Sequence, residues 1–297
     1  MEPADVVALI AEQFPALRPV KAKYLGEGYD CVAFDVAPHW VFRFPKRGEV
    51  EEQVLLEMRV LPLLMKSAPL PIPDYRFRGT PSKRFPRHFG GYRKLPGRPA
   101  IGRDALIATE SIAKDLGRFL SWLHAFPVAL VEPLGVPGID GTSVIDELHD
   151  EAVASFEALR SIASDQPLEA WRRALNQVPA NAQRAAGVLL HADLAAEHVL
   201  WMPDEERLSG VIDWSEIGIG DPAIDLAATY HWGGPAFADR VFAHYVPILD
   251  ESTVERARYL AICRGVADVV FGIETGRTEY IAAGKQALIF NAGGEEP

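Results

Sequence analysis

Two short segments decide the fold of this chain: HADLAAEHVL at His191–Leu200 and GVIDW at Gly210–Trp214. They set two carboxylates and a histidine at the spacing of a phosphoryl-transfer site. Such a site needs one group to orient and deprotonate the acceptor hydroxyl, and ligands for an Mg²⁺ ion that bridges nucleotide phosphates. We therefore predict Asp193 as the catalytic base. His198, which stands in the usual Asn position, and Asp213 are the predicted metal ligands.

These segments, with GDPAID at Gly220–Asp225, resemble the aminoglycoside and macrolide phosphotransferases, which are bacterial antibiotic kinases. The shared pattern is H-x-D, four residues, then N or H, followed by I-D-[FW] and G-D-P-x-x-D. A metal-binding His in the Asn position is typical of the 2''-aminoglycoside and macrolide branches. The resemblance implies structural roles near the site for His191, which orients the loop, and for Asp221 and Asp225, which fix loops. Asp225 is also a candidate helix cap.

The resemblance implies an α+β, bilobal protein-kinase-like fold. Residues 1–94 would form a small antiparallel-sheet lobe with one helix, which binds the nucleotide. Residues 95–297 would form a larger, mainly helical lobe, which carries catalysis and the acceptor. Apolar residues at helical spacing in 105–126 predict a core helix behind the catalytic loop. Residues 144–187 and 251–290 are also expected to be helical.

The N-terminal third contains a glycine-rich turn of the kind that covers nucleotide phosphates. Gly26 and Gly28 lie in it, and glycine lets the backbone approach phosphates closely. Cys31 stands where a third glycine would be expected.

A strand and a helix are predicted to follow this turn. Residues 39–45 alternate and are rich in aromatic side chains, as in a strand. Arg43 is the candidate phosphate contact on that strand, where many relatives have Lys. In kinases this basic residue pairs with a Glu of the next helix, here 49–65. Similarity to 2''-aminoglycoside kinases favours Glu57, with Glu52 as the alternative.

The segment Phe89–Gly97 resembles the hinge between the lobes of the same enzymes. The backbone of Arg93, Lys94 and Leu95 is expected to bind the purine edge. Tyr92 falls at the gatekeeper position, and a bulky aromatic there resembles relatives that favour GTP over ATP. Both GTP and ATP therefore stay open as the phosphoryl donor.

Composition excludes several classes of partner. The net charge of −11 argues against nucleic acid, because phosphate backbones need basic surface, and suits a cationic small molecule. No apolar run is long enough to predict a membrane span. The two cysteines indicate no disulfide framework. The residues from Met1 lack the pattern of a signal peptide, so we expect a cytoplasmic protein.

The predicted function is transfer of the γ-phosphate of GTP or ATP to a hydroxyl of an antibiotic, most of all an aminoglycoside, giving resistance by inactivation. No long activation segment follows Asp213, so a protein substrate is not expected. In the resembling family the late helices wall the acceptor pocket, which makes Trp232, Glu274 and Glu279 candidate acceptor contacts. The alternatives are a macrolide or nucleoside-antibiotic kinase, a metabolic kinase of choline, homoserine or a sugar, and a nucleotide-binding pseudokinase.

Overall fold

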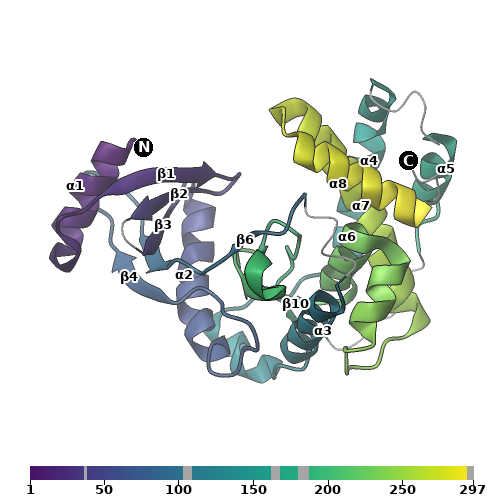
Figure 1. Ribbon diagram of the computed structural model, residues 1–297, viewed down its shortest axis with the longest axis horizontal. Coiled ribbons are helices and arrows are strands. Elements are labelled where there is room, and N and C mark those ends of the chain that lie inside the picture. Colours follow the sequence, from purple (N-terminus) through teal and green to yellow (C-terminus); the bar gives the residue numbers. More distant parts are fainter. Residues whose placement is uncertain (37–38, 103–108, 162–167, 180–186, 293–297) are drawn as a thin grey trace.

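The N-terminal part of the chain is built on a five-stranded antiparallel sheet (Figure 1). The computed structural model describes residues 1–36, 39–102, 109–161, 168–179 and 187–292. The strands run in the order β1-β2-β3-β5-β4. Their bounds are β1 Ala22–Glu27, β2 Cys31–Val36, β3 Trp40–Pro45, β4 Tyr75–Gly79 and β5 Phe89–Arg93. The strand predicted at 39–45 is therefore present as β3.

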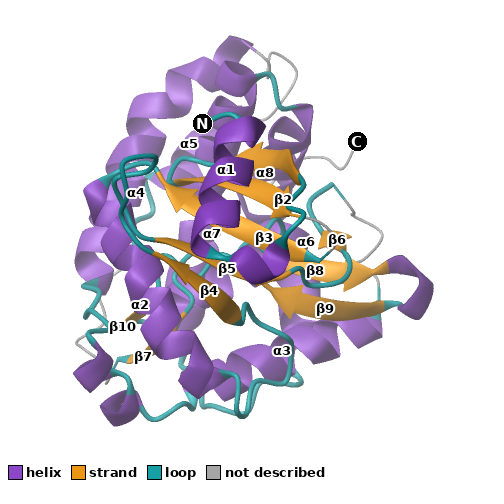
Figure 2. Ribbon diagram, turned by 90° about the vertical axis from the view of Figure 1, so that its left-hand side faces the viewer, coloured by secondary structure: helices purple, strands orange, loops and turns teal. Residues whose placement is uncertain are grey.

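Alternation along β3 separates two hydrophobic cores. Phe42 and Phe44 point to a cluster with Val6, Leu9 and Ile10 of α1, which is Pro3–Gln13. This α1 cluster is completed by Phe34, Val36, Phe85 and Phe89. Figure 2 shows α1 lying across the sheet. The resemblance implied one helix in this lobe, and the structure has a second in α1, whose apolar residues repeat at helical spacing.

The other face of β3 belongs to the larger core. Val41 packs there with α2, which is Gly48–Leu64 and matches the helix predicted at 49–65. The buried side chains of α2 join a cluster that continues into the C-terminal part of the molecule. The α2–β4 loop adds a direct link, because the Val211 backbone N–H donates to Pro71 O at 3.0 Å. Helix α2, which packs against the five-stranded sheet, is thus anchored to both parts of the molecule.

The C-terminal part is mainly helical, with two small sheets, β6-β8-β9 and β7-β10. Its helices are α3 Glu110–His124, α4 Gly141–Ser155, α5 Leu168–Leu175, α6 Ala223–Phe242, α7 Glu251–Thr275 and α8 Thr278–Ala292. Short 3₁₀ segments occur here at Val128–Leu130, Glu132–Leu134, Phe156–Ser161 and Pro203–Glu205, and at Pro15–Leu17 in the N-terminal part. The strands are β6 Arg98–Pro99, β7 Val188–Leu190, β8 Val199–Met202, β9 Arg207–Val211 and β10 Gly218–Gly220. None of these described helices is long and apolar enough to cross a membrane.

The helical predictions agree with these elements apart from their ends. The predicted core helix is α3, and its first predicted residues, 105–108, lie outside the described residues. The region 144–187 contains most of α4 and all of α5, and its residues 162–167 and 180–186 lie outside the described residues. The region 251–290 is two helices, because Gly276 at φ 71° ends α7 in the left-handed conformation that glycine adopts without strain.

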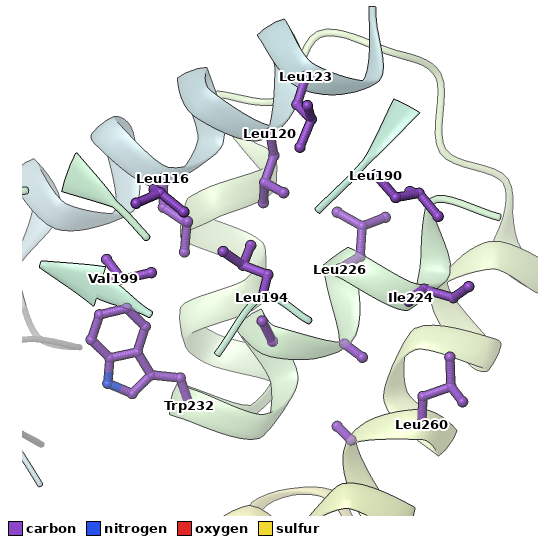
Figure 3. Close-up of a cluster of buried hydrophobic side chains, with 14 of the residues drawn as sticks. Leu116, Leu120, Leu123, Leu190, Leu194, Val199, Ile224, Leu226, Trp232 and Leu260 are labelled. Carbon is purple, nitrogen blue, oxygen red and sulfur yellow. The ribbon is translucent and has the colours of Figure 1, made fainter. Parts of the chain in front are cut away.

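The core beneath the predicted catalytic loop, residues 191–198, is formed by α3 and α6 (Figure 3). Leu116, Leu120 and Leu123 of α3 are almost fully buried, as are Leu194 of the loop and Leu226 of α6. Burying a side chain of this size contributes roughly 1.5–3 kcal/mol. The segment 191–198 therefore rests on a well-packed apolar base.

Candidate active site

The catalytic-loop segment 191–198 connects β7 to β8 and is held by a buried carboxylate. Asp225 of α6 accepts the backbone N–H of His191 at 2.9 Å and that of Ala192 at 2.8 Å. His124 Nε2 lies 3.3 Å from the same carboxylate. Burial alone would raise the pKa of Asp225, but the His124 contact and these backbone bonds hold it below its usual value. The loop is fixed where Ala192 has the unusual φ of +65°.

His191, Asp221 and Asp225, for which the resemblance implies structural roles, each hydrogen-bond to the backbone. His191 Nε2 donates to Ile212 O at 3.0 Å, which ties the loop to the residue before Asp213. Asp225 does not cap α6, because its two oxygens bind the catalytic loop. Asp221 makes the helix-end contact instead, accepting the Ala223 N–H at 3.0 Å, and it is paired with Arg256 at 2.5 Å.

His198 lies between the two predicted carboxylates. Its Nδ1 donates to Asp193 O at 2.7 Å, which directs Nε2 toward Asp213 Oδ2, 3.9 Å away. Burial would lower the pKa of His198, but Asp193 and Asp213 raise it above its usual value. The Asp193 side chain is 44% exposed. The three residues predicted from the two motifs thus lie side by side, with Asp193 facing solvent.

Asp213 is joined to a buried ion pair from the sheet lobe. Arg43 Nη2 donates to Asp213 Oδ1 at 2.5 Å, and Arg43 Nη1 donates to the two oxygens of Glu57 at 2.7 and 3.0 Å. The Tyr75 hydroxyl also donates to Glu57, at 2.9 Å. Burial alone would raise the pKa of Asp213, but Arg43 and His198 hold it well below its usual value. The pairing predicted for Arg43 is made by Glu57, while Glu52 is exposed.

The glycine-rich turn is tied down by two cations that follow β3. Lys46 Nζ donates to Gly28 O at 2.7 Å, and Arg47 donates to Tyr29 O at 3.1 Å. Gly26 lies in β1 and Gly28 in the turn after it, and neither has a heavy atom within 4 Å of the position that a Cβ would take. This segment is therefore not crowded by protein at either glycine, as a loop that lies close to phosphates requires.

The residues of the predicted hinge, 92–95, lie in two different environments. Tyr92 is buried, with its ring centroid 5.2 Å from that of Tyr75. Arg93, Lys94 and Leu95 line a cavity of about 1270 Å³ next to the α2–β4 loop. None of the catalytic-loop residues or Asp213 lines that cavity. The backbone N–H of Lys94 donates to His39 O at 2.7 Å, and the purine contacts of residues 93–95 remain a prediction.

A small cavity of about 140 Å³ opens beside Asp193 and is rich in charge. Glu197, His231, Arg264 and Asp268 line it together with Asp193. His231 Nε2 lies 3.0 Å from Asp268 Oδ2. The sequence did not single out these four residues for this role. Arg264 and Asp268 lie four positions apart on α7, and that spacing, which places two side chains on one helix face, was the available signal.

The acceptor contacts expected from the resemblance are not among the described residues that line this cavity. Trp232 is buried, with its ring centroid 5.5 Å from that of Phe237. It immediately precedes the break in α6, where Gly233 and Gly234 leave helical geometry. Glu279 is paired with Arg277 at 2.9 Å, and Glu274 is exposed. These three residues remain predictions as acceptor contacts.

The site supplies few metal ligands of its own. Within the described residues, no group of three or more His, Cys, Asp and Glu is arranged to hold an ion. His198 Nε2 and Asp213 Oδ2 are the pair that can reach one ion. Mg²⁺ is usually bound through one or two carboxylates, with substrate phosphates and waters completing the octahedron. Asp213 supplies one such carboxylate, and Nε2 of His198 can add a nitrogen donor when the imidazole is neutral. This donor set therefore fits Mg²⁺ that arrives with a nucleotide.

The chain is similar to known phosphotransferases in sequence and in fold. The model of the phosphotransferase enzyme family (APH) matches residues 21–260. Viomycin phosphotransferase of Streptomyces vinaceus is 26% identical over 196 residues, which cover 64% of this chain and 66% of that relative. The GDP and kanamycin complex of APH(2")-IIia superposes with a TM-score of 0.70 at 27% identity, over 95% of this chain and 96% of that one. Macrolide 2'-phosphotransferase type I has a TM-score of 0.63 at 25% identity, over 95% of each chain.

Proposed function

Because the chain belongs to the phosphotransferase enzyme family, we propose that it moves the γ-phosphate of GTP or ATP to a hydroxyl of an antibiotic, most of all an aminoglycoside. The observation that carries this proposal is the position of His198 between Asp193 and Asp213. It gives the site a solvent-facing carboxylate for the acceptor and a second carboxylate, linked to Arg43, for the nucleotide. The bilobal kinase-like fold and the kinase-type transfer to alcohol groups expected from the sequence agree with the family and its solved relatives.

On the nucleotide side, Arg43 is the proposed phosphate contact. Its guanidinium is aimed by Glu57 and reaches Asp213, so it lies beside the proposed metal ligands. Arg supplies a planar fork that suits phosphate oxygens, which supports it in a position where relatives carry Lys. Bound Mg²⁺ would neutralise charge on the phosphates, held by His198 and Asp213. Gly26 and Gly28 would cover the phosphates, and the linker backbone at 93–95 would bind the base.

On the acceptor side, Asp193 is the proposed base. It orients the acceptor hydroxyl and takes its proton as the acceptor oxygen bonds to the γ-phosphorus. The bond from that phosphorus to the β–γ bridging oxygen breaks in line, and GDP or ADP leaves. Loss of the carboxylate should lower the rate on the order of 10²–10⁴-fold, the range typical of general acid–base catalysis.

The charge around Asp193 supports a cationic acceptor. Among the described residues, three carboxylates line the small cavity, those of Asp193, Glu197 and Asp268, against one guanidinium, that of Arg264, so its lining stays negative. The whole chain carries a net charge of −11. An excess of carboxylates over cations attracts ammonium groups and focuses the field on the approach to the site. These features support an amino-bearing antibiotic over an uncharged acceptor. We place the reaction in the cytoplasm, where the donor nucleotides are available, and propose neither a nucleic acid nor a protein as substrate.

The test is phosphoryl transfer from GTP and from ATP to a panel of aminoglycosides, macrolides, nucleoside antibiotics, choline and homoserine, read as the mass gain of one phosphate. Asp193→Asn is the test variant, and Asp204→Asn, at an exposed position outside the site, is the matched control. Transfer to an aminoglycoside that Asp193→Asn abolishes and Asp204→Asn retains is the expected result. Full turnover by Asp193→Asn would remove the proposed base. Nucleotide binding without any transfer would favour the pseudokinase alternative.

A further inference from the structure

The backbone carbonyls of Ala192, Asp193 and Leu194 are all engaged by side chains. His198 takes the middle one, as described above. Arg264 of α7 takes the two on either side, because its Nη2 donates to Ala192 O at 3.3 Å and its Nη1 donates to Leu194 O at 3.0 Å. One guanidinium therefore brackets the proposed base from both directions along the chain.

This bracket acts on a strained part of the backbone. Ala192 has a φ of +65°, a region that residues with a Cβ rarely adopt and that persists only where the surroundings fix it. Asp225 holds the N–H groups of His191 and Ala192, which leaves the carbonyl side of this segment unrestrained by that residue. Arg264 holds the carbonyl side. The two helices α6 and α7 thus hold the catalytic loop through opposite polar groups.

Neither His198 nor Arg264 donates a hydrogen bond to the carboxylate of Asp193, although His198 Nδ1 lies 3.5 Å from Asp193 Oδ2. Arg264 Nη2 lies 3.9 Å from Asp193 Oδ1, which is longer than a hydrogen bond but close enough for attraction between opposite charges. The oxygens of Asp193 therefore keep their lone pairs for an acceptor hydroxyl. A cation in this cavity would repel an amino-bearing acceptor, so binding such an acceptor does not explain why Arg264 lies there.

We propose that Arg264 is a positioning residue, which holds the backbone on both sides of Asp193 so that the carboxylate meets the acceptor hydroxyl. This inference rests on the proposed function of Asp193 as the base. The planar guanidinium of Arg264 donates to two carbonyl groups at once. The ammonium of Lys is a compact point charge, so it would bind one of the two carbonyls at most. Arg264→Lys should therefore restore only part of the positioning.

The kinetic test compares Arg264→Met and Arg264→Lys with Arg258→Met. Arg258 lies on the same helix and also donates to a backbone carbonyl, Asn291 O at 2.7 Å, away from the catalytic loop. Arg264→Met should lower kcat on the order of 10²-fold, the effect of a misplaced reacting group. Its KM for nucleotide should stay within about twofold of wild type, because the nucleotide contacts lie elsewhere. Arg264→Lys should fall between, and Arg258→Met should keep wild-type kcat.

A second measurement does not depend on turnover. Hydrogen exchange of the amides in residues 191–198 should accelerate in Arg264→Met and stay unchanged in Arg258→Met. A kcat within threefold of wild type in Arg264→Met, or unchanged exchange of this segment, would overturn the proposal. If the wild type phosphorylates no acceptor, the proposed function fails, and the exchange result alone decides whether Arg264 positions the loop.

Discussion

Replacing Arg43 with methionine removes the cation from the buried cluster that joins the two lobes. The side chains of Arg43 and Glu57 are 7% and 0% exposed, so Glu57 would be left with the Tyr75 hydroxyl as its described donor. Breaking a buried pair by removing one partner is expected to lower the free energy of unfolding by about 3–5 kcal/mol. Asp213 is 36% exposed and keeps Ser215 as a donor, so it adds less to this loss.

The size of the loss should depend on pH, because Glu57 can become neutral. Burial raises the pKa of Glu57 to about 7 even beside Arg43, and removal of the cation raises that pKa further. A carboxyl group whose pKa is higher in the folded state than in the unfolded state binds more protons when folded. Stability then falls as pH rises from the unfolded value toward the folded one. The deficit of Arg43→Met relative to wild type should be smaller at about pH 5 than at about pH 8, by about 1 kcal/mol or more.

Urea unfolding followed by tryptophan fluorescence at both pH values measures this difference. The double variant Arg43→Met/Glu57→Leu fills the same space with apolar groups and should recover most of the lost stability. It should not recover phosphoryl transfer, because the proposed phosphate contact is gone. The reasoning is refuted if Arg43→Met loses less than about 1 kcal/mol at about pH 8, or if the double variant is no more stable than the single one.

Two further predictions concern packing and the catalytic loop. A Cβ at Gly90 would lie 2.4 Å from the buried Tyr75 ring, so Gly90→Ala should lose about 1–3 kcal/mol in thermal unfolding, whereas Gly48→Ala, with open space around it, should lose nothing. Equal melting temperatures for these two variants would contradict the packing argument. Asp225→Asn should lose about 1–3 kcal/mol, because one amide oxygen replaces two carboxylate oxygens that accept loop N–H groups. The lowered pKa of Asp225, held down by His124 and the backbone bonds against burial, means that its contribution is present above about pH 4 and lost in stronger acid. The difference between wild type and Asp225→Asn should therefore shrink in acid denaturation, and a difference that is constant with pH would argue against this assignment.

Short motifs in the sequence correctly predicted which side chains lie close to one another. Asp193 and His198 lie in one loop, and that loop fixes their distance whatever the rest of the chain does. Arg43 was found from strand alternation, because a period of two decides which face of β3 a side chain occupies. Glu57 follows from the resemblance alone, and it lies within reach of Arg43 because α2 packs against β3.

The acceptor side could not be predicted in the same way. Glu197, His231 and Asp268 come from the catalytic loop, α6 and α7, and they meet only because these elements dock in one register. No local pattern encodes that register. Trp232 was expected at the acceptor, but it lies just before the break of α6 at Gly233 and is buried against Phe237. The expected carboxylates of the late helices lie close to the turn at Gly276, where they are exposed or paired.

The separation of the two hydrophobic cores has a consequence for how this enzyme can diversify. The α1 cluster contains none of the groups proposed for the reaction, whereas the core that includes α2 continues to the catalytic loop. Phe42 and Phe44 of this cluster flank Arg43 in β3, whereas its α1 members, Val6, Leu9 and Ile10, lie on a separate helix. Substitutions on α1 can raise stability at a distance from the proposed reacting groups. Proteins remain close to a stability threshold, and changes that alter specificity usually destabilise. Helix α1 is therefore where a lineage can accumulate compensating changes before its acceptor cavity is remodelled.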